Sequence, residues 1–161
     1  MKRILFVCHG NICRSPMAEY VMRELVRRAG ASDEVEVASL ACRTDEIGSD
    51  VHAGTRRVLE AKGIPCPRRA ARLVRREDYE TYDVIVAMDE ENMRDLMRLF
   101  CGDPERKCHL LLSFAGEDRE VADPWYTGDF ETTYQDVLQG CKALLRAITT
   151  DSSLARSDEW A

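Results

Sequence analysis

The chain has 161 residues, 45% of them hydrophobic, and a formal net charge of −6. Its length and composition predict a single domain with a full hydrophobic core, and its acidic charge argues against nucleic acid or an acidic membrane surface as a partner. No apolar stretch approaches the ~20 residues of a membrane span, and the apolar run near residue 4 is too short for a signal peptide, so we expect a cytoplasmic protein without a membrane partner.

Short apolar runs alternate with segments of helical periodicity along residues 1–150. The apolar runs predict strands over residues 4–7, 35–39, 84–88 and 109–112. The second run is the weakest and is expected at a sheet edge. The periodic segments predict helices over residues 16–29, 54–62, 75–82, 93–100 and 130–148.

Strands separated by helices predict an α/β fold over residues 1–150. We expect a single domain in which a four-stranded parallel sheet carries helices on both faces, as in flavodoxin-like folds. Residues 151–161 have little apolar content and are expected to form a frayed C-terminal tail.

The stretch from Cys8 to Pro16 joins the first strand to the first helix. Gly10 is expected to adopt the positive φ of a tight loop, so that the backbone N–H groups of residues 9–14 turn inward and form an anion-binding nest. The helix that begins at Pro16 adds the positive end of its dipole, and Ser15 is expected to cap it. The loop therefore predicts a site for a tetrahedral anion.

Cys8 and Arg14 stand at the two ends of this loop. A helix N-terminus and a neighbouring cation both favour the thiolate form of a cysteine. A guanidinium can hold two oxygens of a tetrahedral anion in a bidentate fork, which a lysine cannot. Together these features indicate a cysteine nucleophile directed at a phosphate group.

The seven cysteines include no Cys-x2-Cys pair, and the three histidines have no metal-ligand spacing. The absence of such cysteine pairs argues against a disulfide framework. Together with the histidine spacing, it also argues against a zinc site. We expect reduced thiols and neither a metal nor another cofactor.

The sequence from Cys8 to Pro16 resembles the signature loop of the low-molecular-weight protein-tyrosine phosphatases. Asp123-Pro124-Trp125-Tyr126 resembles the general-acid loop of that family, and residues 87–92 resemble its third conserved segment. The match follows the family's order from residue 1 to about residue 150. It implies metal-free hydrolysis of phosphotyrosine in proteins or peptides through a phosphocysteine intermediate.

The resemblance also assigns roles to individual residues. Cys8 is the expected nucleophile, Arg14 the expected phosphate fork, and Asp123 the expected general acid, which the loops at the carboxyl ends of parallel strands can bring to Cys8. Trp125 and Tyr126 are expected to wall the slot for an aryl phosphate. The remaining phosphate contacts are expected from the loop: His9, Gly10, Asn11, Ile12, Cys13 and Ser15, with the Ser15 hydroxyl also donating to the Cys8 sulfur and Asn11 bracing the loop.

Three features depart from the family's pattern or remain open. The family often places an aromatic residue in the loop where this chain has residues 43–46, which leaves substrate preference open. Arg69 and Glu19 stand where the family has a histidine and an acid, and we predict an ion pair between them. Cys13 is either a redox guard that traps oxidised Cys8 as a disulfide or a residue that only packs beneath the loop.

Other functions remain as alternatives. A thiol-coupled arsenate reductase would use a Cys-x6-Cys pair, and Cys101 and Cys108 have that spacing, although Cys101 lies a helix beyond the third strand. A phosphoarginine phosphatase is a second alternative, which Ile12 disfavours because that branch tends to have a smaller polar residue there. A non-catalytic phosphotyrosine-binding module would not need Cys8, Arg14 and Asp123 together. The sequence leaves the oligomeric state open.

Overall fold

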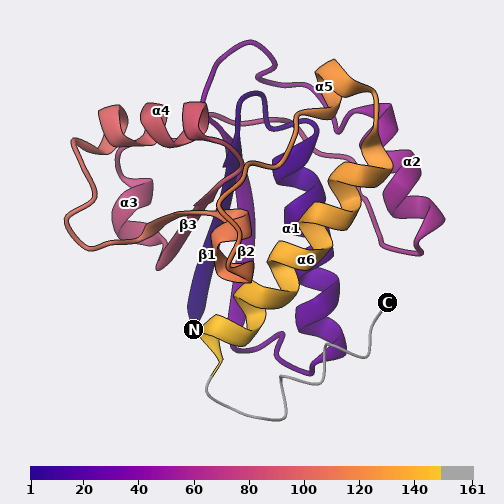
Figure 1. Cartoon of the computed structure of the whole chain (residues 1–161), viewed down its shortest axis with the longest axis horizontal. Coiled ribbons are helices and arrows are strands. Elements are labelled where there is room, and N and C mark those ends of the chain that lie inside the picture. The colour runs from indigo at the N-terminus through magenta and orange to yellow at the C-terminus, as the bar shows by residue number, and fades with distance from the viewer. Residues whose placement is uncertain (150–161) are drawn as a thin grey trace.

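A central sheet of four parallel strands separates two layers of helices in the computed structural model, which describes residues 1–149 (Figure 1). The strand order is β2-β1-β3-β4, so the second strand lies at an edge, as predicted. The predicted tail, residues 151–161, lies outside the described residues. The strands are β1 (Lys2–Cys8), β2 (Val35–Ala41), β3 (Val84–Ala87) and β4 (Cys108–Leu110).

The two faces of the sheet are covered by different helices, which confirms the predicted α/β arrangement (Figure 1). One face packs against α1 (Arg14–Arg28) and α6 (Phe130–Ile148), with α2 (Ala53–Ala61) beside them. The other face packs against α3 (Asp78–Thr81) and α4 (Glu90–Phe100). Within residues 1–149, no helix combines the length and apolar character needed to cross a membrane.

The strand β1 shows why the sheet needs cover on both sides. Ile4 and Phe6 point into the layer of α1 and α6, whereas Leu5 and Val7 point into the layer of α4. All four side chains are fully buried. Successive residues of a strand face opposite sides of a sheet, so a continuous apolar run is what a doubly covered central strand requires.

Several element boundaries differ from the sequence predictions. The third helix is shorter, since the Asp78 carboxylate accepts the N–H of Arg75 at 2.7 Å and holds the preceding residues in a turn. The fourth strand ends at Leu110, where the Ser113 hydroxyl donates to the Leu110 carbonyl at 2.6 Å and a 3-10 helix, Leu111–Ala115, follows. A short helix that the sequence did not indicate, α5 (Pro124–Thr127), follows Asp123.

The strand register brings three loops to one edge of the sheet. Cys8, the last residue of β1, pairs with Ala41 at the end of β2, and Val7 pairs with Ala87 at the end of β3. The loops that follow these strands therefore start side by side at the carboxyl ends, where parallel sheets bind their ligands.

Candidate active site

A cavity of about 150 Å³ opens at this edge of the sheet. It brings together most of the residues that the sequence predicted for the site, and it adds two acidic residues from the loop after β2. Its lining consists of Cys8, His9, Gly10, Ile12, Cys13, Arg14, Asp45, Glu46, Asp123, Trp125 and Tyr126. The two other predicted residues, Asn11 and Ser15, are fully buried behind it.

The Cys8 sulfur lies at the end of β1 and contacts Ser15 twice. The Ser15 hydroxyl oxygen is 3.0 Å from the sulfur, and the Ser15 N–H donates to it at 3.4 Å. The Asn11 amide donates to the same hydroxyl oxygen at 2.8 Å, which leaves the hydroxyl proton free to point at Cys8. Two donors of Ser15, its hydroxyl and its backbone N–H, therefore face the sulfur.

The prediction that Ser15 caps the first helix is wrong. The helix begins at Arg14, two residues before the predicted start, and Cys13 occupies the cap position without a side-chain hydrogen bond. The Ser15 hydroxyl is inside the first turn and is turned toward Cys8 instead.

The conformation of the Cys8–Ser15 loop depends on Asn11 rather than on Gly10. Asn11 has a φ of 58°, in the left-handed region, whereas Gly10 is not among the residues with positive φ, so the prediction for Gly10 is wrong. Asparagine tolerates this region because its short polar side chain bonds locally. Gly10 serves a close approach instead: a Cβ there would lie 3.2 Å from Cγ of Glu46.

A buried hydrogen-bond network braces Asn11 from outside the cavity. Arg69 donates to the Asn11 carbonyl at 2.6 Å, to the Asn11 side-chain oxygen at 2.5 Å, and to the Ser39 hydroxyl at 3.2 Å. Ser39 in turn accepts from the Asn11 amide at 2.9 Å and donates to Glu19 at 2.6 Å. Glu19 forms its ion pair with Arg23, at 2.5 Å.

The predicted ion pair between Glu19 and Arg69 is therefore wrong in its direct form. Ser39, at 6% exposure on the edge strand, stands between the two side chains and bonds both. Sequence reasoning gave Ser39 no role, because nothing in a single serine within a strand indicates which groups it will meet.

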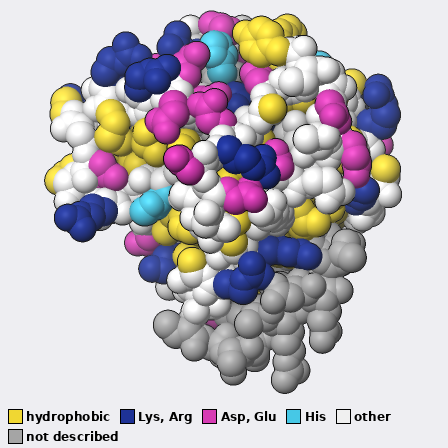
Figure 2. Space-filling model, viewed as in Figure 1, with side chains coloured by type: hydrophobic (Ala, Val, Ile, Leu, Met, Phe, Trp, Pro, Cys, Tyr) yellow, Lys and Arg dark blue, Asp and Glu magenta, His cyan; other side chains and the backbone are white. Residues whose placement is uncertain are grey.

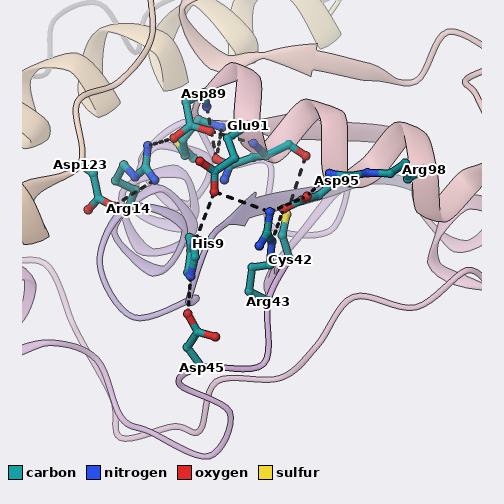
Figure 3. Close-up of polar contacts among 12 residues, drawn as sticks. His9, Arg14, Cys42, Arg43, Asp45, Asp89, Glu91, Asp95, Arg98 and Asp123 are labelled. Atoms are coloured by element: carbon teal, nitrogen blue, oxygen red, sulfur yellow. Dashed lines mark hydrogen bonds and ion pairs between the residues drawn. The ribbon is translucent and has the colours of Figure 1, made fainter.

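Arg14 is almost fully buried and is held by two acids and a carbonyl (Figure 3). One terminal nitrogen donates to Asp89 at 2.8 Å and to the Val121 carbonyl at 2.9 Å, and the other points at Asp123 from 3.4 Å. Burial disfavours the guanidinium charge, but the negative charges of Cys8, Asp123 and Asp89 outweigh it and raise the pKa of Arg14. Arg14 is therefore a fixed cation at the cavity.

Asp89 belongs to the segment, residues 87–92, that resembles the family's third conserved segment, but it was not among the predicted site residues. It lies two residues after the end of β3 and is the N-cap of α4, where it accepts the Asn92 N–H at 2.8 Å. An acid placed just after a buried parallel strand was the available signal, because such positions lie at the ligand-binding edge.

Asp123 reaches the cavity from the N-terminus of α5. Its side chain accepts the Trp125 N–H at 3.1 Å, and Pro124 fills the first helical position, where its missing N–H has no cost. The other carboxylate oxygen faces Arg14. Trp125 and Tyr126 stand at the cavity mouth and remain 56% and 83% exposed.

A contact between aromatic rings links the α5 segment to the Cys8–Ser15 loop. Trp125 meets the ring of His52 edge-on at a centroid distance of 5.7 Å, and His52 stacks on Phe130 at 5.0 Å. The His52 backbone N–H donates to the Ile12 carbonyl at 2.9 Å. The sequence carried no signal for this role, since a single histidine before a helix has many ordinary explanations.

His9 lies between two carboxylates at the cavity rim (Figure 3). Its Nε2 is 2.6 Å from Asp45, and its Nδ1 is 3.6 Å from Glu91. The hydrogen bond from His9 lowers the pKa of Asp45 below its ordinary value. The loop after β2 thus supplies an acidic wall.

Cys101 and Cys108 lie at the other end of the sheet from Cys8. Cys101 is the C-cap of α4, whose N-cap Asp89 binds Arg14 and whose 11 residues span about 16 Å. Cys108 is the first residue of β4, at the end opposite to the carboxyl edge. This placement away from Cys8 disfavours the arsenate reductase alternative.

A cysteine and an arginine that close the loop between the first strand and first helix of a parallel sheet are typical of a cysteine-dependent phosphatase. Comparison with known proteins indicates the same class of enzyme. A family model described as "Low molecular weight phosphotyrosine protein phosphatase" matches residues 3–154. The low molecular weight protein-tyrosine-phosphatase YfkJ of Bacillus subtilis is 37% identical over 157 residues, covering 96% of this chain and 100% of that protein. A human low molecular weight phosphotyrosine protein phosphatase is 38% identical over 151 residues, covering 89% and 94%.

Comparison with solved structures indicates the same family. The crystal structure of YfkJ matches with a TM-score of 0.88 and 38% identity, covering 92% of this chain and 94% of that one. A Drosophila arginine phosphatase matches with a TM-score of 0.84 and 29% identity, covering 94% and 100%. The chain belongs to the low molecular weight phosphotyrosine protein phosphatase family.

Proposed function

We propose that this chain hydrolyses phosphotyrosine in proteins or peptides through a phosphocysteine intermediate on Cys8. Family membership assigns the protein-tyrosine phosphatase activity, and the roles of individual residues are our inference. The observation that carries them is the Cys8 sulfur beside the Ser15 hydroxyl, in the cavity that Arg14 and Asp123 also line.

In the first step, the Cys8 thiolate attacks phosphorus and the bond from phosphorus to the tyrosyl oxygen breaks. Protonated Asp123 gives its proton to that oxygen, so that a neutral phenol leaves. The charge of the transferred group is held by the N–H groups of the Cys8–Ser15 loop and by Arg14, whose position Asp89 and the Val121 carbonyl fix.

In the second step, water attacks the phosphocysteine. The Asp123 carboxylate accepts the proton of that water, the bond between phosphorus and sulfur breaks, and inorganic phosphate forms. The hydrogen bond from Ser15 to the sulfur stabilises Cys8 as it leaves as a thiolate.

The exposed rings of Trp125 and Tyr126 support an aryl phosphate as substrate, because a phosphorylated phenol can stack on them while its phosphate reaches the loop. The Ile12 side chain adds apolar surface to the same cavity. We place the protein in the cytoplasm, and its seven free cysteines support a reducing compartment.

Phosphoarginine hydrolysis is the second candidate, since the Drosophila arginine phosphatase has a similar structure. The test compares one peptide sequence carrying phosphotyrosine, phosphoserine or phosphoarginine, in buffer containing a metal chelator. We expect phosphotyrosine to be hydrolysed most efficiently and Cys8→Ser to bind phosphopeptide without turnover. Faster release of phosphate from phosphoarginine would favour the second candidate, and steady turnover by Cys8→Ser would remove the phosphocysteine intermediate.

A further inference from the structure

The wall of the active-site cavity is aromatic along one stretch and acidic along another. Trp125 and Tyr126 supply the aromatic stretch, and Asp45 and Glu46 supply the acidic one. Both stretches border the cavity that holds Cys8. When the phosphotyrosine of a peptide reaches Cys8, the residues next to it therefore come close to the carboxylates of Asp45 and Glu46.

The rim contains too few cations to balance its carboxylates. His9 is a single side chain approached by two carboxylates, Asp45 at 2.6 Å and Glu91 at 3.6 Å, so it can balance at most one of their two negative charges. Arg43 is already bound by Asp95 through hydrogen bonds of 2.8 and 3.0 Å, and it only approaches Glu91 at 3.7 Å (Figure 3). Negative charge is left over at the rim.

This charge is open to an incoming peptide. The side chains of Asp45 and Glu91 are 62% and 51% exposed. Figure 2 shows several acidic side chains and a histidine along the upper edge of the molecule. A lysine or arginine next to phosphotyrosine can pair with these carboxylates, and each exposed ion pair strengthens binding by roughly two- to fivefold. An acidic neighbour meets repulsion instead.

We propose that Asp45 and Glu91 determine sequence specificity, and that they select phosphotyrosine flanked by lysine or arginine over phosphotyrosine flanked by acidic residues. Trp125 and Tyr126 hold the phosphorylated ring, and Asp45 and Glu91 at the rim interact with the charges of its neighbours. This inference rests on the proposed phosphotyrosine activity and names the substrates that this activity prefers.

The test uses phosphotyrosine peptides that differ only in the residues immediately before and after phosphotyrosine, which are both lysine, both alanine or both glutamate. We expect kcat/KM for the lysine peptide to exceed that for the glutamate peptide by on the order of tenfold at low salt. Raising the salt to about 0.5 M should reduce this ratio toward one, because exposed charges are screened.

The double variant Asp45→Asn, Glu91→Gln should lose most of the lysine-to-glutamate ratio. The matched control is Glu34→Gln, which removes an exposed carboxylate just before β2, at the end of that strand away from the cavity, and should keep the ratio. Equal kcat/KM for the three peptides in the wild type would overturn the inference, as would a ratio that the double variant leaves unchanged. Failure to hydrolyse any of the peptides would instead overturn the proposed function.

Discussion

Arg69 supports the Cys8–Ser15 loop from outside the cavity, and Arg69→Ala measures what that support contributes. The substitution removes three hydrogen bonds, two to Asn11 and one to Ser39. Hydrogen bonds from charged donors contribute about 1.5–3 kcal/mol each. Asn11 is fully buried, so unless water enters the space that the arginine leaves, its carbonyl oxygen loses the Arg69 donor and its side-chain oxygen keeps only the Arg72 N–H, at 3.4 Å.

We expect Arg69→Ala to lower the free energy of unfolding by about 3 kcal/mol, which is less than the sum of the three bonds because water replaces part of them. Urea unfolding, with the slope and midpoint both fitted, measures this change. The rate should fall as well, since Asn11 also positions the Ser15 hydroxyl beside Cys8. The control is Arg68→Ala, an exposed neighbour that we expect to change stability by less than about 0.5 kcal/mol.

The hydrogen bonds that Ser39 makes to both Glu19 and Arg69 allow a second test of this bracing role. Glu19 and Arg69 do not touch but share the Ser39 hydroxyl, so Glu19→Gln and Arg69→Ala should be non-additive by at least about 0.5 kcal/mol. If Arg69→Ala is no more harmful than Arg68→Ala, the bracing role is refuted. Additive losses in the double-mutant cycle would refute the coupling alone.

The remaining predictions concern the cavity itself. Asp123→Asn should slow phosphoenzyme formation by ~10²–10⁴-fold for phosphotyrosine and far less for aryl phosphates with good leaving groups; rapid-quench measurements across a series of phenols test this, and an equal loss for all of them would place the acid elsewhere. Arg14→Lys should lose activity severely although its charge is kept, because a lysine cannot form the fork; steady-state rates within a few-fold of wild type would contradict this. Burial and the nearby Cys8 charge raise the pKa of Cys13 to about 12, so Cys13 stays a thiol at neutral pH and peroxide should attack Cys8 first. If Cys13 then traps the oxidised sulfur, dithiol should restore wild type after peroxide treatment and restore Cys13→Ser poorly, whereas equal recovery would leave Cys13 a packing residue.

The parts of the fold that the sequence predicted are those that local pattern determines. The apolar run of residues 4–7 in β1, followed by a cysteine, a loop and a helix, could be identified directly, because burial on both faces of the sheet leaves a run without polar residues. Apolar residues recur at helical spacing along α6, and this stripe predicted the bounds of the helix, Phe130–Ile148. The meeting of Cys8 with Asp123 followed from the rule that loops at the carboxyl ends of parallel strands share an edge.

The parts that it missed depend on contacts between distant segments. The positive φ falls on Asn11 because Arg69 and Ser39 hold its side chain, and both lie far along the chain. The Ser15 hydroxyl is not used as a cap because the sulfur and the Asn11 amide are closer partners in the folded loop. Propensity rules describe the backbone conformation and the hydrogen bonds that a residue prefers without such neighbours. At a site with buried polar groups, the neighbouring side chains determine both.

The proposed nucleophile and the proposed acid stand on elements of very different local stability. Cys8 ends a central strand with its apolar side chains fully enclosed, whereas α5 has four residues and buries only Pro124. Amide hydrogens of β1 should therefore exchange with deuterium only when the whole domain unfolds, whereas those of α5 should exchange through local opening. Local opening of α5 can then move Asp123 away from the cavity mouth, so that substrate enters or phosphate leaves. The Cys8 sulfur and its hydrogen-bond donors keep their positions meanwhile.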